Sequence, residues 1–86
     1  MINIKENNKK FAELTMEIIE NKYDILFDYE IIKSEDKWSR LIINFSVNLK
    51  NNIISVPIYY EVQVIDKLVE DISKRIDEQL IKSYMK

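Results

Sequence analysis

The fold is decided by residues 41–60, which read LIINFSVNLKNNIISVPIYY. Apolar and polar residues alternate up to Leu49 and again after Asn52, and this period of two is typical of half-buried strands. Asn tolerates a positive φ well for a residue with a Cβ, so Asn51-Asn52 predicts a two-residue type I′ hairpin turn. The turn predicts four inward-facing pairs: Leu49 with Ile54, Val47 with Val56, Phe45 with Ile58, and Ile43 with Tyr60.

A further strand precedes this hairpin. Residues 23–33 also alternate, and the residues expected to face inward are Ile25, Phe27, Tyr29 and Ile31. Residues 34–37 are polar and predict a turn into the next strand. Pro57 has no N–H to donate to a neighbouring strand, which places the third strand, residues 53–60, at an edge of the sheet.

Helical periodicity flanks the three strands on both sides. The first helix is expected from Asn8 to about residue 22, with Asn7 or Asn8 as its N-cap. The second is expected over residues 66–84. Their predicted core-facing residues are Phe11, Leu14, Ile18 and Ile19 in the first helix, and Ile65, Leu68, Val69, Ile72, Ile76 and Leu80 in the second.

These elements predict one small α+β domain over residues 1–86, with residues 1–7 as a short N-terminal lead. The order is α-β-β-β-α, and the three strands form an antiparallel meander. Each amphipathic helix must bury its apolar stripe, so both are expected on one face of the sheet.

The composition excludes many kinds of chemistry. The 86 residues include no Cys, no His and no Gly. Without them the chain has no thiol nucleophile, no zinc knuckle, no histidine to act as the usual general base and no glycine-rich phosphate loop. We therefore expect a non-enzymatic protein with no catalytic residues, no cofactor and no metal site. No apolar run approaches the roughly 20 residues of a membrane span, so a cytoplasmic location and no membrane partner are expected.

Charge is unevenly distributed. Residues 13–36 carry eight acids against Lys22 and Lys33, whereas residues 37–60 carry only Lys37, Arg40 and Lys50. One interpretation is an acidic face that docks on a basic surface of a partner protein. The other is an ordinary solvated surface. The candidate partner-binding residues are Glu13, Glu17, Glu20, Asp24, Asp28, Glu30, Glu35 and Asp36.

The outer face of the sheet offers an alternative interface. Large apolar patches often mark contact surfaces, and five apolar residues are expected to point away from the helices. They would support self-association, such as a homodimer, and they are Leu26, Ile32, Ile42, Ile53 and Tyr59. Trp38, at the start of the second strand, either covers the core or anchors a partner.

Nucleic-acid binding is the third hypothesis, supported by the three cations of residues 37–60. Double-stranded-RNA-binding domains share the same element order, but they use a basic helix end, and here the second helix begins Asp66-Lys67-Leu68-Val69-Glu70-Asp71. Ile, Lys and Asn are abundant while Gly, Ala, Pro and Arg are scarce, which indicates an AT-rich gene. In size, composition and acidity the chain resembles the small inhibitors encoded by phages and mobile elements, such as anti-CRISPR proteins.

Overall fold

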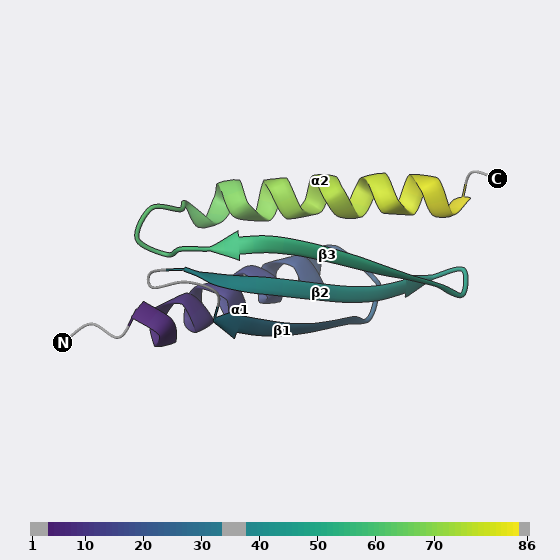
Figure 1. The fold of residues 1–86 in the computed structure, drawn as a ribbon. Coiled ribbons are helices and arrows are strands. Elements are labelled where there is room, and N and C mark those ends of the chain that lie inside the picture. Colours follow the sequence, from purple (N-terminus) through teal and green to yellow (C-terminus); the bar gives the residue numbers. More distant parts are fainter. Residues whose placement is uncertain (1–3, 34–37, 85–86) are drawn as a thin grey trace.

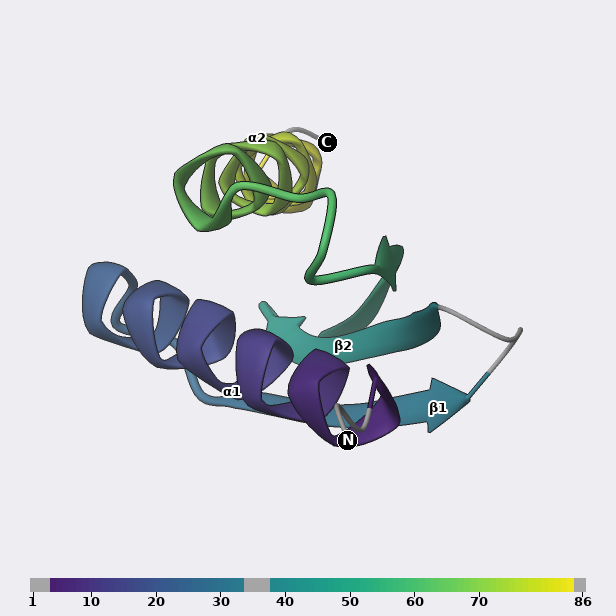
Figure 2. The same ribbon diagram turned by 90° about the vertical axis from the view of Figure 1, so that its left-hand side faces the viewer.

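Two helices pack on one face of a three-stranded antiparallel sheet whose strand order is β1-β2-β3 (Figures 1 and 2). The computed structural model describes residues 4–33 and 38–84. The predicted α-β-β-β-α meander is confirmed. The elements are α1 (Ile4–Lys22), β1 (Phe27–Lys33), β2 (Ser39–Val47), β3 (Lys50–Ile58) and α2 (Ile65–Tyr84).

The core lies between the sheet and the helices. Alternate residues of β2 and β3 face inward, as the period of two predicts, and full burial of each large aliphatic side chain contributes roughly 1.5–3 kcal/mol. The buried strand residues are Phe27, Leu41, Ile43, Phe45, Val47, Ile54, Val56 and Ile58. The helices contribute Ala12, Met16, Ile19, Leu68, Ile72 and Ile76.

The hairpin turns three residues earlier than the sequence predicts. Its central residues are Asn48 and Leu49, with φ of 53° and 66°, and Val47 pairs with Lys50. Asn51 and Asn52 belong to β3, and Leu49, predicted to face inward, is fully exposed. Apart from Leu49 and Tyr60, both turns place the same residues inward, because moving the turn by three residues changes the pairing by an even number. The alternation therefore could not distinguish them.

The observed turn lets β3 end at Ile58 and frees the following residues for a tight connection to α2. In that connection the N–H groups of Val62 and Gln63 both donate to the carbonyl of Tyr59. The side chain of Gln63 accepts from the N–H of Tyr59 at 2.7 Å and donates to the carbonyl of Pro57 at 2.9 Å. The predicted register would have drawn Tyr60 into the strand instead.

Helix α1 begins earlier than predicted and uses a different face. Asn8, predicted as an N-cap, lies inside the helix and is 1% exposed. Its Oδ1 accepts from the N–H of Tyr60 at 3.0 Å, and its Nδ2 lies 3.4 Å from Oγ of Ser39. The buried side chain thus ties α1 to the start of β2 and to the residues that follow β3, at the open end of the β2–β3 hairpin.

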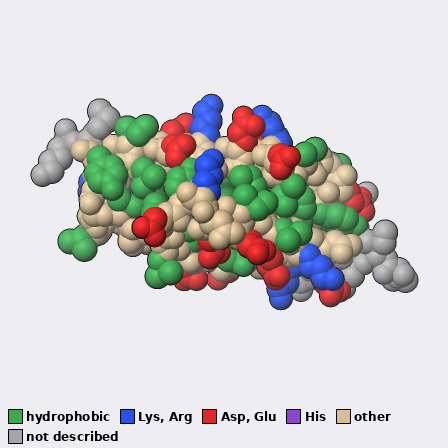
Figure 3. Space-filling model, turned by 180° about the vertical axis from the view of Figure 1, so that it is seen from behind, with side chains coloured by type: hydrophobic (Ala, Val, Ile, Leu, Met, Phe, Trp, Pro, Cys, Tyr) green, Lys and Arg blue, Asp and Glu red, His purple; other side chains and the backbone are tan. Residues whose placement is uncertain are grey.

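The predicted apolar stripe of α1 is only partly buried. Leu14 is 53% exposed and Ile18 is 41% exposed, while Ala12, Thr15 and Met16 face the sheet. The small side chain of Ala12, and Thr15 with its hydroxyl bonded to the carbonyl of Phe11, occupy the contact face. Figure 3 views the helix side and shows the apolar side chains that remain visible between charged ones.

Candidate functional site

The helical acids of the candidate binding set lie on one flank of α1. Glu13, Glu17 and Glu20 are all exposed, and spacings of three and four residues place them on the same side of the helix. Asp24 is exposed in the connection from α1 to β1. Of the other four candidates, Glu35 and Asp36 lie outside the described residues.

Tyr29 shows that this acidic flank borders β1. Burial raises the pKa of Tyr29, and the negative charges of Glu13 and Glu20 raise it further. A phenolate is disfavoured beside carboxylates because like charges repel. Because Tyr29 is a half-buried residue of β1 on the helix side of the sheet, the two glutamates lie on that side, near β1.

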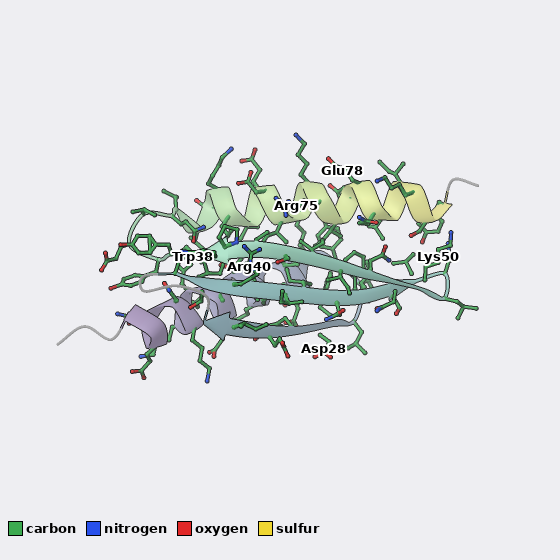
Figure 4. The ribbon with its side chains drawn as sticks, in the orientation of Figure 1. Asp28, Trp38, Arg40, Lys50, Arg75 and Glu78 are labelled. Carbon is green, nitrogen blue, oxygen red and sulfur yellow. The ribbon has the colours of Figure 1, made fainter. Side chains whose placement is uncertain are left out.

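The two acids of β1 itself point to the opposite face. Asp28 pairs with Asn44 and Glu30 pairs with Ile42, and both acids are exposed on the open side of the sheet. The candidate acids therefore do not form a single flat face. They border β1 on both sides, with Glu13 and Glu20 behind it and Asp28 and Glu30 in front, and we call these four residues the β1 rim (Figure 4 labels Asp28).

Asp28 also lines a shallow depression in the open face near the hairpin end. Its volume is about 540 Å³, and it is lined by polar side chains from all three strands together with the apolar residues Leu26, Phe27 and Phe45. The amide and hydroxyl groups of Asn44, Ser46 and Asn51 give it donors and acceptors beside the carboxylate. This depression lies immediately in front of the β1 rim and extends the polar surface onto the sheet.

The edge formed by β1 is open. The backbone N–H and C=O groups of successive residues in a strand point to opposite sides. In an edge strand, the backbone groups of every second residue therefore have no neighbouring strand to bond to. The carbonyls of Ser55 and Pro57 point away from β2, because they accept from Arg75 and Gln63. The backbone hydrogen bonds between β2 and β3 are therefore made by the inward-facing residues of β2, and the other residues of β2 bond to β1. Tyr29 and Ile31 then direct their backbone groups to the open edge.

The opposite edge, formed by β3, is protected. Pro57 has no N–H, and its carbonyl accepts from Gln63. The carbonyl of Ser55 accepts from Nη1 of Arg75 at 3.0 Å, and α2 runs beside the strand (Figure 1). The edge placement predicted from Pro57 is confirmed. The two sheet edges thus differ in chemistry, and β1 is the one that offers an accessible backbone.

The alternative interface is dispersed over the open face. Ile42 lies diagonally beside both Ile32 and Ile53, because their direct partners are Arg40 and Asn44. Leu26 is 92% exposed just before β1. Tyr59 lies beyond the end of β3, where its hydroxyl donates to Glu61 at 2.9 Å. Three of the five residues thus form a diagonal apolar line across the sheet.

Of the cations of residues 37–60, the two that the structure describes, Arg40 and Lys50, are not brought together. Arg40 pairs with Pro57 at one end of the hairpin, and Lys50 pairs with Val47 at the other. Lys37 lies outside the described residues. Trp38 is half-buried, and the guanidinium of Arg40 lies 5.4 Å from the centre of its ring. No sequence pattern indicated that Arg40 and Arg75 of α2 would both bond to Ser55.

Three further findings concern possible sites. The described part of the chain holds no group of three or more Asp or Glu side chains placed to bind a metal ion. Neither α1 nor α2 is long and apolar enough to cross a membrane. No protein-family model matches the chain, and no curated protein or solved structure matches it. Function is therefore inferred from the surface chemistry alone.

Proposed function

We propose that this chain is a non-enzymatic binding protein whose β1 rim docks on a basic surface of a partner protein. The observation that carries the proposal is the position of Tyr29, which places Glu13 and Glu20 behind the same open-edged strand that presents Asp28 and Glu30 in front. A strand edge bordered by carboxylates on both sides suits a partner that presents Lys and Arg side chains around an accessible backbone.

Binding of this kind blocks whatever the basic surface otherwise holds. Complementary charge speeds the encounter, and exposed charges are screened over about 10 Å at 0.1 M salt, so the association weakens as salt rises. A small protein that occupies a basic groove is an inhibitor by steric exclusion. Within this proposal, the biological setting is that of the inhibitors encoded by phages and mobile elements, including anti-CRISPR proteins.

The test begins with capture of a partner from a lysate of the source cells, identified by mass spectrometry. The affinity of that partner is then measured for the wild-type protein and for the triple variant Glu13→Lys, Glu17→Lys, Glu20→Lys. We expect the triple variant to lose binding, while its thermal midpoint stays near that of the wild type because all three side chains are exposed.

A matched control separates the rim from net charge. Glu70, Asp71 and Glu78 are exposed on α2, and their replacement by Lys changes the net charge by the same amount. This control should retain most of the affinity. Binding that survives reversal of the α1 acids, or that both triple variants lose equally, would show that the β1 rim is not the docking surface.

The apolar diagonal of the open face favours a second candidate, self-association. Ile42 lies between Ile32 and Ile53, so a second copy would cover all three at once. The double variant Ile42→Glu, Tyr59→Ala should then convert a dimer to a monomer in analytical ultracentrifugation. A wild-type protein that is already monomeric at high concentration would eliminate this candidate.

A further inference from the structure

The two arginines of the chain meet at one residue of β3. Nη1 of Arg40, from β2, lies 2.8 Å from Oγ of Ser55, and Nη1 of Arg75, from α2, lies 3.0 Å from the carbonyl oxygen of Ser55. Ser55 pairs with Ile42 in the sheet, so the Ser55 hydroxyl and the guanidinium of Arg40 are on the open face, while the Ser55 carbonyl and the guanidinium of Arg75 are at the outer edge of β3. Residues far apart in the sequence therefore place two fixed positive charges next to each other.

The side chain of Arg40 is held in place on two sides. Its guanidinium lies 5.4 Å from the centre of the Trp38 ring, which is an attractive cation–π arrangement, and its Nη1 is bonded to the Ser55 hydroxyl. Figure 4 shows Trp38 and Arg40 next to each other on the open side of the sheet, with Arg75 above them on α2. A guanidinium fixed in this way loses less conformational entropy when it binds a ligand.

Within the described residues, neither Arg40 nor Arg75 forms an ion pair with a carboxylate. Asp71, one turn before Arg75, is instead 3.7 Å from Lys67. A guanidinium carries five N–H donors, and only one from each arginine is used at Ser55, so donors remain for a ligand.

We propose that Arg40 and Arg75 form a binding site for a phosphate monoester. Two guanidinium groups bonded to the same residue, one at its hydroxyl and one at its carbonyl, match the charge and the several oxygens of a tetrahedral dianion, and each offers paired donors in a planar fork. The Ser55 hydroxyl lies beside them as an additional donor. The site is on the β3 side of the sheet, away from the β1 rim, and does not depend on the docking function proposed above.

The test is an NMR titration of the ¹⁵N-labelled protein with inorganic phosphate and, separately, with phosphoserine, at constant ionic strength. We expect saturable shifts of the arginine Nε–H signals and of the Ser55 amide. Saturation by both ligands shows that the site recognises the phosphate group itself. Saturation by phosphoserine alone shows that it recognises the ester.

Three variants define the site. Arg40→Gln and Arg75→Gln should each weaken binding roughly tenfold or more, because a charge-assisted hydrogen bond contributes on the order of 1.5–3 kcal/mol. Lys74→Gln makes the same charge change at the neighbouring exposed position and should leave the affinity within about twofold of the wild type. Thermal denaturation of each variant verifies that it is folded.

The proposal is overturned if the arginine signals do not shift, or if the shifts do not saturate and spread over the surface lysines. It is also overturned if Lys74→Gln weakens binding as much as Arg75→Gln does. In the last case, phosphate binding would depend only on the net charge of α2 and not on Arg75 itself.

Discussion

The hydroxyl of Tyr23 donates a hydrogen bond to Oδ1 of Asp77 over 2.6 Å, which fastens the end of α1 to the middle of α2. The same hydroxyl lies 3.1 Å from the carbonyl oxygen of Ser73. The Tyr23 ring also meets the edge of Phe27, with 6.2 Å between ring centres, so the residue joins the helix pair to β1. One side chain thus joins the end of α1 and the start of β1 to α2, whose contacting residues lie 50 and 54 positions further along the chain.

Removing this hydroxyl should loosen the helix pair without disturbing the ring contact. The variant Tyr23→Phe is expected to lose about 0.5–1.5 kcal/mol of unfolding free energy, which is the net value of a typical hydrogen bond. In a domain of this size each kcal/mol lowers the thermal midpoint by roughly 4–8 °C. Calorimetry gives the shift, and Tyr84→Phe, which alters an exposed tyrosine of α2, serves as the control. An equal shift in both variants would contradict the role of Tyr23.

The same contact predicts a loss of stability in alkali. Burial, together with the hydrogen bond to Asp77, raises the pKa of Tyr23 to about 12, against 10.0 for an unperturbed tyrosine. The folded state therefore holds this proton more tightly than the unfolded state, and the stabilisation is complete below pH 10 and is lost between pH 10 and 12. Urea midpoints measured from pH 8 to 12 should fall more steeply for the wild type than for Tyr23→Phe. Parallel curves would refute the assignment.

The buried side-chain amide of Asn8 should contribute more to folding stability than its place in a helix suggests. In Asn8→Ala the N–H of Tyr60 loses its acceptor, and an unsatisfied polar group costs about 1–3 kcal/mol. Asn21→Ala, at an exposed position of the same helix, should change stability by less than about 0.5 kcal/mol. Chemical denaturation of the two variants measures the difference, which should clearly exceed the error of the extrapolation.

The position of the hairpin turn is tested by two glycine substitutions. Leu49 holds φ at 66°, a conformation that glycine adopts without steric cost, so Leu49→Gly should stabilise the protein by up to about 1 kcal/mol. Asn52→Gly should destabilise it, because Asn52 lies within β3 opposite Phe45. A turn at Asn51-Asn52 would reverse both signs, so the pair of thermal midpoints distinguishes the two registers.

The sequence predicted the order of the elements, the sheet and most of the core, because those depend on hydrophobic periodicity. It placed the hairpin turn wrongly because two registers of the same parity bury the same side chains. It also missed the buried role of Asn8, since an Asn near a helix start is usually a cap. Which stripe of α1 faces the sheet is set by how closely Ala12 and Thr15 let the backbones approach.

The candidate site was predictable in part. The acidic block is visible as a run of charge, but its division between the two sides of β1 follows from strand alternation and from the position of α1 over Tyr29. The meeting of Arg40 and Arg75 depends on how α2 lies along β3, and no local pattern reports that placement.

The protected β3 edge limits how far sheets of this protein can grow. Pro57 has no backbone donor, and Gln63 and Arg75 already occupy two of the carbonyls on that side. A chain that can be extended through a single edge can gain one neighbour by strand pairing and then has no site for the next. Association by that route ends at a pair and cannot propagate into a fibril.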